Sequence, residues 1–211
     1  MSKEKQRINR ILAELKKLYP DAGPELLFTN PFEMLVATML SAQCTDKQVN
    51  KVTPALFAKY PDPFAMAIAP LSEVYPMVKS CGFASKASNI LATSKILVEQ
   101  YNGRVPSTME ELTQLPGVGR KTANVVMANA FHIPSLAVDT HVFRVSNRLG
   151  LAKANTELAT EKQLMDAIPK EDWIDAHHWL ILHGRRVCNA RGPKCNECTL
   201  RVDCKNPDKS K

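Results

Sequence analysis

The sequence predicts an all-α protein, and three observations support this prediction. Apolar residues recur at helical spacing along most of the chain, as in Ile8, Ile11, Leu12, Leu15 and Leu18. Segments with this spacing end at residues that cap or break helices. No stretch alternates apolar and polar residues for long enough to indicate a β-sheet.

Start and stop residues place the expected helices of the first half. The first helix ends before Pro20, and Asn30 followed by Pro31 caps a second that runs to Leu40. A third begins near residue 87 and stops at Asn102, a residue that tolerates the left-handed backbone of a helix end.

The second half continues in the same way. Ser107 and Glu110 form a capping box before a short helix. Gly150 and Gly184 are expected terminators of two later helices. The further helices are expected at residues 120–131, 140–149, 156–168 and 171–183.

Charge and composition indicate a polyanionic partner. The 211-residue chain has a formal net charge of +7 and a sequence pI of about 9.1. From Gly184 to Lys211 there are eight Lys or Arg and three Asp or Glu. A basic segment of this kind either binds an anion or is simply solvated, and composition alone leaves both interpretations open.

The chain shows no membrane or export signal. No apolar stretch follows the charged residues of its first ten positions, and no apolar run is long enough to cross a membrane. We therefore expect a cytoplasmic protein without a membrane partner. Its six cysteines are not expected to form structural disulfides in a reducing compartment. Cys44 and Cys81, in apolar surroundings, are expected to be buried free thiols.

Residues 115–123, L-P-G-V-G-R-K-T-A, predict a phosphate-binding hairpin. Pro116 stops one helix, and Gly117 and Gly119 permit backbone angles that other residues avoid. Unpaired N–H groups at the start of the next helix then form an anion site. This arrangement resembles the helix–hairpin–helix element that binds the DNA backbone. The candidate DNA contacts here are Gly117, Val118, Gly119 and Arg120.

Two residues near the hairpin suggest chemistry. Lys121 follows the glycines directly, and a lysine that loses its proton is a nucleophile. Asp139, in A-V-D-T-H, offers a carboxylate that acts as a base or stabilises positive charge. From the residues alone, Lys121 is equally a phosphate-binding lysine, and Asp139 is also suited to cap the helix that begins at Thr140.

Four cysteines near the C-terminus predict a metal centre. Cys188, Cys195, Cys198 and Cys204 are separated by six, two and five residues, with Gly192 in the loop between the first two. Four thiolates at one point require a cation, which leaves zinc or an iron–sulfur cluster. A single C-x-x-C pair favours the cluster, but ligand chemistry leaves zinc open.

Together these motifs resemble the endonuclease III family, bifunctional DNA glycosylases of the helix–hairpin–helix superfamily. The resemblance extends from the first helix to Cys204. It rests on the cysteines and on three segments, L-S-A-Q-C-T-D (40–46), L-P-G-V-G-R-K-T-A-N-V-V (115–126) and A-V-D-T-H-V-F-R-V (137–145).

The resemblance implies a mechanism and a cofactor. Lys121 would attack the sugar of an extruded nucleotide, forming a Schiff base and then cutting the strand by β-elimination. Asp139 would supply the carboxylate, and the four cysteines would hold a 4Fe–4S cluster. Gln43 would fill the space left by the nucleotide, and Phe83 would wedge the opposite strand. Many relatives have leucine at this last position, so Phe83 is a departure.

The resemblance also implies an architecture and a substrate. A six-helix barrel would span residues 22–133, and residues 1–21 with 134–211 would form a second helical domain that carries the cluster. DNA would lie between them, contacted by His141, Arg191 and Lys194. The substrate would be double-stranded DNA with oxidised or ring-saturated pyrimidines or abasic sites. We expect a nucleoid-associated monomer.

Three alternatives are weighed against this interpretation. An adenine-mismatch glycosylase would lack Lys121 and carry a further C-terminal domain. A non-catalytic helix–hairpin–helix module with a structural metal would have no need of Lys121 and Asp139 together. A redox or electron-transfer role of the cluster is compatible with repair. His177, His178 and His183 are expected to pack within a helix rather than bind a metal.

Overall fold

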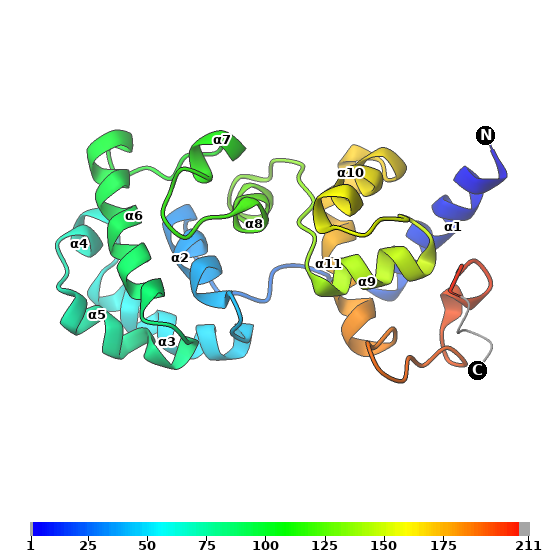
Figure 1. Cartoon of the computed structure of the whole chain (residues 1–211), viewed down its shortest axis with the longest axis horizontal. Coiled ribbons are helices and arrows are strands. Elements are labelled where there is room, and N and C mark those ends of the chain that lie inside the picture. The colour runs from blue at the N-terminus through cyan, green and yellow to red at the C-terminus, as the bar shows by residue number, and fades with distance from the viewer. Residues whose placement is uncertain (1, 207–211) are drawn as a thin grey trace. The chain divides into compact units, whose positions relative to one another are not determined.

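The computed structural model describes residues 2–206, which form helices and loops with no strand among them. The all-α prediction is confirmed. The chain divides into two compact units, here called unit 1 (Met1–Gly23 and Pro134–Lys211) and unit 2 (Pro24–Ile133). Figure 1 shows the elements of both units. The end of the basic C-terminal segment, residues 207–211, lies outside the described residues.

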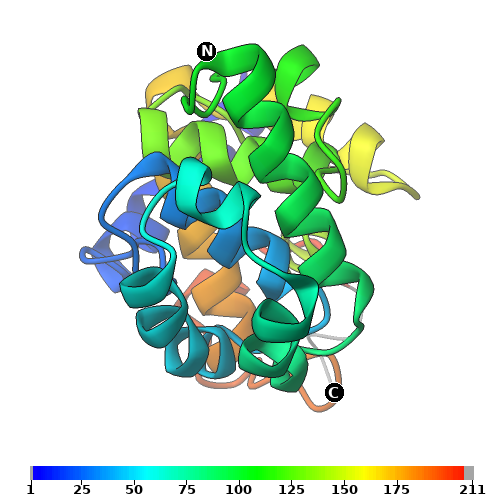
Figure 2. The same ribbon diagram turned by 90° about the vertical axis from the view of Figure 1, so that its left-hand side faces the viewer.

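Unit 2 is built around one helix that is buried on nearly every side. This helix is α2 (Pro31–Ser41), in which every residue from Met34 to Leu40 is buried. It packs against α8, α3 and α6, and α4 lies alongside α6 (Figure 2). The elements around α2 are α3 (Asp46–Lys59), α4 (Pro63–Ala67), α5 (Leu71–Val78), η1 (Lys79–Cys81), α6 (Ser85–Tyr101), α7 (Met109–Leu112) and α8 (Arg120–Phe131).

Unit 1 joins the N-terminal helix to helices from the C-terminal half of the chain. Its N-terminal helix α1 (Lys3–Leu18) packs against α11 and η3, so Ile11 and Leu15 share a core with Val142 and Leu180. The apolar face that the sequence predicted for this first helix is therefore buried by residues more than a hundred positions away. The other elements are α9 (Thr140–Leu149), α10 (Glu157–Ala167), η2 (Lys170–Asp172), α11 (Trp173–Arg186) and η3 (Thr199–Arg201).

Most of the expected caps are confirmed. Asn30 accepts a hydrogen bond from the Glu33 N–H at the start of α2. Asn102 and Gly150 adopt left-handed conformations, with φ of 51° and 71°, at the ends of α6 and α9. These caps explain why the helix limits in these parts of the chain agree closely with those expected.

Two of the expected helix limits are wrong. The cap of α7 is Thr108, not Ser107, because Thr108 pairs with Glu111 one position further along. Gly184 does not terminate α11, which continues to Arg186. A Cβ at Gly184 would lie 3.0 Å from the Val145 side chain, so this glycine allows close packing of α11 on α9.

The helices between residues 46 and 78 were not predicted individually. Thr45 caps α3 by accepting from the Gln48 N–H, and Pro54 lies inside that helix. None of the helices in the described part of the chain is long and apolar enough to span a membrane.

Candidate functional site

The glycine hairpin of unit 2 joins α7 to α8. Gly117 has a φ of +77°, and a Cβ there would lie 2.7 Å from the side-chain amide nitrogen of Asn89 on α6. Gly119 is the N-cap residue of α8 and has no side chain to bond the first turn. The hairpin therefore needs glycine at Gly117 and leaves the start of α8 open to an external hydrogen-bond acceptor.

The candidate nucleophile lies in the first turn of α8. Arg120 and Lys121 are both exposed, whereas Val118 is buried and its N–H donates to the carbonyl of Leu115 at 3.0 Å. The hairpin thus anchors itself through Val118 and presents two cations beside the free end of the helix. This is a suitable arrangement for a phosphate and for a nucleophilic amine near it.

Gln43 and Phe83, although forty residues apart, line one pocket of unit 2, together with Gly117 and Asn89. Phe83 is 68% exposed, which excludes it from the core, and Gln43 is exposed with a φ of +53°. Gln43 caps no helix, because Ala42 ends α2 and Thr45 begins α3. Both side chains are therefore free to contact a ligand.

Asp139 is the N-cap residue of α9 in unit 1. Its carboxylate accepts from the Val142 N–H at 2.7 Å, which confirms the capping role. The segment before it is buried, and the Ala137 carbonyl lies 2.7 Å from Nδ1 of His177 on α11. The carboxylate is thus held at the edge of the unit by its own helix and by a buried histidine.

The four cysteines of the C-terminal segment line one pocket of unit 1, with Arg148, Lys194 and Arg201 around them. None of the six cysteines, all of which lie in the described residues, forms a disulfide. In the described residues no group of three or more His, Cys, Asp or Glu side chains has the arrangement of a single-ion site. The Cys198 thiol has a raised pKa, because it is partly buried and lies near the other three cysteines.

Polar groups surround the cysteine sulfurs. Arg148 donates to Sγ of Cys188 at 3.5 Å, and the Asn206 N–H donates to Sγ of Cys204 at 3.4 Å. The Nε2 atom of His183 lies 3.6 Å from Sγ of Cys198. Donors of this kind stabilise thiolate ligands, so the chemistry of the pocket fits a bound metal or iron–sulfur group.

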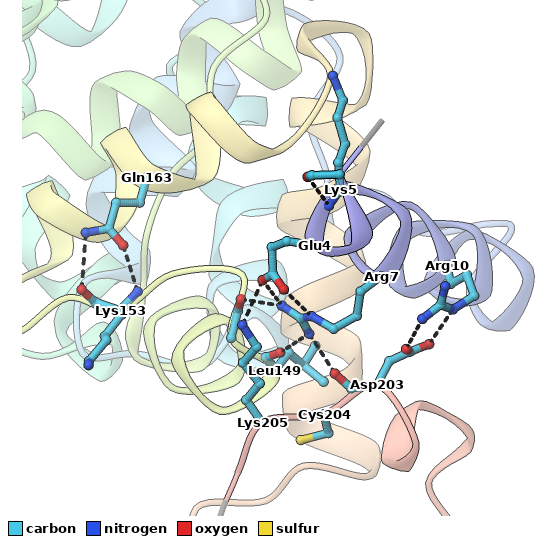
Figure 3. A network of polar contacts seen from close by, with 12 residues as sticks. Glu4, Lys5, Arg7, Arg10, Leu149, Lys153, Gln163, Asp203, Cys204 and Lys205 are labelled. Carbon is cyan, nitrogen blue, oxygen red and sulfur yellow. Dashed lines mark hydrogen bonds and ion pairs between the residues drawn. The ribbon is translucent and has the colours of Figure 1, made fainter.

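Helix α1 holds the last part of this segment (Figure 3). Arg7 donates to the carbonyls of Leu149, Gly150 and Asp203, at 2.7, 2.7 and 2.6 Å. Arg10 pairs with the Asp203 carboxylate, one position before Cys204. These contacts attach the final cysteine to the first helix of the chain.

The basic candidates are distributed over unit 1. Arg191 and Lys194 are exposed in the cysteine loop, and His141 is partly buried on α9. Burial lowers the pKa of His141, and its Nδ1 lies 3.2 Å from Arg144. The same arginine donates to the Gly184 and Cys188 carbonyls, which ties α9 to the cysteine segment.

The remaining histidines and thiols behave mostly as expected. His177, His178 and His183 are buried in α11, and the Tyr19 hydroxyl lies 3.0 Å from Nδ1 of His183. Cys81 is buried, but Cys44 is partly exposed, so the expectation of two buried thiols is wrong for Cys44.

Sequence reasoning overlooked the residues that position others. Arg7 and Arg144 bind backbone carbonyls near the cysteines, and Lys86 does the same near Gln43 and Phe83. Arg7 and Lys86 have the sequence context of ordinary surface cations, and Arg144, although it lies in the segment A-V-D-T-H-V-F-R-V, carries no separate signal of its role. Their roles can be recognised only in the folded structure, where distant segments of the chain are in contact.

The chain is similar in sequence to known DNA repair proteins. A model of the "HhH-GPD superfamily base excision DNA repair protein" matches residues 36–170. Endonuclease III of Synechocystis is 52% identical over 97% of this chain and 94% of its own. The Bacillus subtilis and Escherichia coli K12 enzymes are 48% and 46% identical over 97% and 94% of this chain and 94% and 95% of their own.

Solved structures of endonuclease III are also similar to this chain. An endonuclease III in a non-covalent complex with DNA superposes with a TM-score of 0.90 at 49% identity, and 95% of each chain is covered. The structure of a trapped endonuclease III–DNA covalent intermediate matches equally well. This chain therefore belongs to the endonuclease III family of the HhH-GPD superfamily.

Proposed function

We propose that this protein is a DNA glycosylase with abasic-site lyase activity that works in base excision repair. The observation that carries the proposal is the exposed amine of Lys121 in the first turn of α8, directly after a glycine hairpin suited to a phosphate. Membership of the endonuclease III family supports it, since a relative has been trapped covalently on DNA.

In the proposed reaction, the neutral Lys121 amine attacks the anomeric carbon of the damaged nucleotide. The bond from that carbon to the base breaks, and the base leaves with its electron pair and takes up a proton. The sugar ring then opens and the amine nitrogen forms a Schiff base with the same carbon. Loss of a proton from the neighbouring sugar carbon expels the 3′ phosphate and cuts the strand.

Asp139 is proposed to assist this reaction through its charge. Positive charge builds on the sugar as the base departs, and a carboxylate stabilises it. The same carboxylate can also accept a proton. Its hydrogen bond to Val142 fixes its position and does not exclude either role, because one oxygen remains for the substrate.

Contacts with DNA are proposed at three places. The hairpin from Gly117 to Arg120 would bind a phosphate, with the buried Val118 holding the loop. Arg191 and Lys194, together with His141, would bind the backbone from unit 1. Such phosphate contacts make binding fall steeply with added salt.

Gln43 and Phe83 are proposed to enter the duplex. Extruding a nucleotide costs a few kcal/mol of stacking, and exposed side chains that occupy the gap offset this cost. The two residues line a common pocket and are both exposed, which supports their acting together.

The proposed cofactor is a 4Fe–4S cluster held by Cys188, Cys195, Cys198 and Cys204. Four thiols on one pocket match its four irons, and the nearby N–H donors suit thiolate ligands. When bound, the cluster would stabilise the loop that carries Arg191 and Lys194.

The proposed substrate is duplex DNA with oxidised or ring-saturated pyrimidines or abasic sites. The family supports this class of lesion. We further propose that the protein acts in the cytoplasm, associated with the nucleoid, because its substrate is the chromosome, and that it acts as a monomer.

The test uses a duplex with one thymine glycol, incubated with the wild type and with Lys121→Gln. The wild type should release the modified base and nick the strand at that position. Lys121→Gln should do neither while binding the duplex within a few-fold of wild-type affinity. Binding without any product by the wild type would favour a non-catalytic module, and release of adenine from a mismatched duplex would favour the mismatch enzyme.

A further inference from the structure

Lys86, in the first turn of α6, is a lysine that is only 9% exposed. Its ammonium group donates to three backbone carbonyls, of Leu40 at 2.7 Å, of Ala42 at 2.5 Å and of Cys81 at 2.5 Å. An ammonium group has three N–H donors. All of them are therefore used inside the protein, and none is left for a phosphate.

These carbonyls belong to two separate segments of unit 2. Leu40 and Ala42 lie at the end of α2, immediately before Gln43, whereas Cys81 ends η1, two residues before Phe83. The ammonium group thus joins the backbones that present the two side chains proposed to enter DNA.

Next to the carbonyls that Lys86 binds, the backbone of each segment has a positive φ, which a regular helix does not have. Gln43 has a φ of +53° and Gly82 a φ of +113°. A Cβ at Gly82 would lie 3.6 Å from Nζ of Lys86, so the chain turns closely around the ammonium group. Helix hydrogen bonds cannot fix the backbone at such points, but a charged donor to the carbonyls can.

The ammonium group also lies beneath the candidate DNA surface. Lys86 lines the same pocket as Gln43, Phe83 and Gly117. The backbone segments that carry Gln43 and Phe83 are therefore both bound to Lys86 at the pocket that these two residues line.

We propose that Lys86 is a positioning residue for nucleotide extrusion. It fixes the separation of Gln43 and Phe83 so that both can enter the duplex together, and it does not touch the DNA itself. This inference rests on the proposed function. It predicts that Lys86 matters when a base pair must be opened and not when the abasic sugar is already accessible.

The test compares two substrates with Lys86→Met, which keeps most of the side-chain stem and removes the ammonium group. On a single-stranded oligonucleotide with one abasic site, strand cleavage should stay within about 3-fold of wild type, since no stacked base has to leave. On a duplex with one thymine glycol, base release should fall at least 10-fold, the loss expected when extrusion becomes limiting.

The control variant is Lys59→Met. Lys59 is an exposed lysine of the same unit, paired with Glu73 away from the pocket. Both of its rates should stay within about 2-fold of wild type. A second readout is 2-aminopurine placed opposite the lesion, whose fluorescence reports unstacking. At saturating protein, Lys86→Met should give less than half of the wild-type increase.

Equal losses on both substrates would overturn the proposal and make Lys86 a purely structural residue, and so would no loss on either. In a variant with Gln43→Ala and Phe83→Ala, adding Lys86→Met should lower the duplex rate by less than 2-fold, and a further 10-fold loss would contradict the inference. If Lys86→Met does not fold, Lys86→Gln replaces it and must show the same preference for the single strand. A wild type that cleaves neither substrate would instead refute the proposed function.

Discussion

The two roles of Asp139 can be separated by substitution, because capping requires only a hydrogen-bond acceptor and the proposed chemistry requires a charge. Asparagine caps helices about as well as aspartate. Asp139→Asn should therefore keep the bond to the Val142 N–H, which is 2.7 Å long in the wild type, and lose the carboxylate. Asp139→Ala removes both.

The magnitudes follow from this geometry. Loss of an N-cap acceptor costs about 0.5–2 kcal/mol. In a protein of this size each 1 kcal/mol lowers the Tm by roughly 2–4 °C. Asp139→Ala should therefore melt roughly 1–8 °C lower, and about 2–4 °C lower for a typical cap loss of about 1 kcal/mol. Asp139→Asn should melt within about 2 °C of wild type, since it loses only the attraction between a carboxylate and the helix dipole.

Base release should respond differently. Removal of a preorganised electrostatic group typically lowers a rate by about 10²–10³-fold. Both variants should lose at least 100-fold in single-turnover base release from a thymine glycol duplex, although only one of them is destabilised.

Thr156→Ala is the matched control. Thr156 caps α10 in the same unit by accepting from the Ala159 N–H at 3.2 Å. This variant should lose stability comparable to Asp139→Ala with base release within 2-fold of wild type. If Asp139→Asn also releases base within 3-fold of wild type, the carboxylate has no catalytic role and Asp139 is a cap only.

Further predictions concern other buried or bridging groups. Burial, followed by the neighbouring His177, lowers the pKa of His178 to about 3. The unfolded chain binds a proton on His178 below about pH 6.5, whereas the folded chain does not. This histidine should therefore lower the free energy of unfolding by about 1.4 kcal/mol for each pH unit below that value. In urea titrations at pH 7.5 and 5, His178→Leu should show a correspondingly smaller fall in the free energy of unfolding. Arg7→Met should accelerate iron release from the proposed cluster to a ferrous chelator several-fold, because Arg7 holds the Asp203 carbonyl beside Cys204. Burial, with the nearby Cys44, raises the pKa of Cys81 to about 11, so Cys81 should resist alkylation by iodoacetamide at pH 8 in the native protein.

Each of these predictions has a result that contradicts it. An unchanged pH dependence in His178→Leu would mean that this histidine is not kept neutral by the fold. Lys3→Met, on the exposed part of α1, is the control for Arg7→Met. Equal rates of iron release from both variants would show that Arg7 does not stabilise the segment around Cys204. Stoichiometric alkylation of Cys81 before unfolding, detected by peptide mass mapping, would show that the thiol is accessible and ionised.

The parts of the fold that could be predicted are those set by local interactions. Asn30, Asn102, Asp139 and Gly150 act on backbone groups within a few residues, so their sequence context is sufficient to predict the helix ends. The hairpin is local in the same sense, because Gly117 and its neighbours form it within one turn.

One wrong helix limit is set by contact with a distant element, and the other errors lie in how local patterns were read. Gly184 has the sequence context of a helix terminator, but it packs against α9 and the helix continues. The cap at Thr108 differs from the expected one by a single position, since Ser107 and Thr108 both have a glutamate three residues later. Helix α3 contains Pro54, which is unfavourable inside a helix, but Val49, Val52 and Leu56 have helical spacing, and Thr45 with Gln48 was a capping pattern that could have revealed it.

In the candidate site too, residues in local sequence motifs could be predicted, and residues whose role depends on distant contacts could not. The sequence motifs around Lys121 and the cysteines were sufficient to nominate those residues. Lys86 could not be nominated, because a lysine is ordinarily exposed and its three carbonyl partners belong to segments that meet only in the folded unit.

Borohydride trapping tests the central claim most directly. The wild type and Lys121→Gln are each incubated with a duplex containing one thymine glycol and reduced with borohydride, and the covalent products are digested and mapped by mass spectrometry. The wild type should give one protein–DNA adduct on the peptide that contains Lys121, and Lys121→Gln should give none. An adduct on another lysine, or equal trapping by both proteins, would contradict the assignment of Lys121 as the nucleophile.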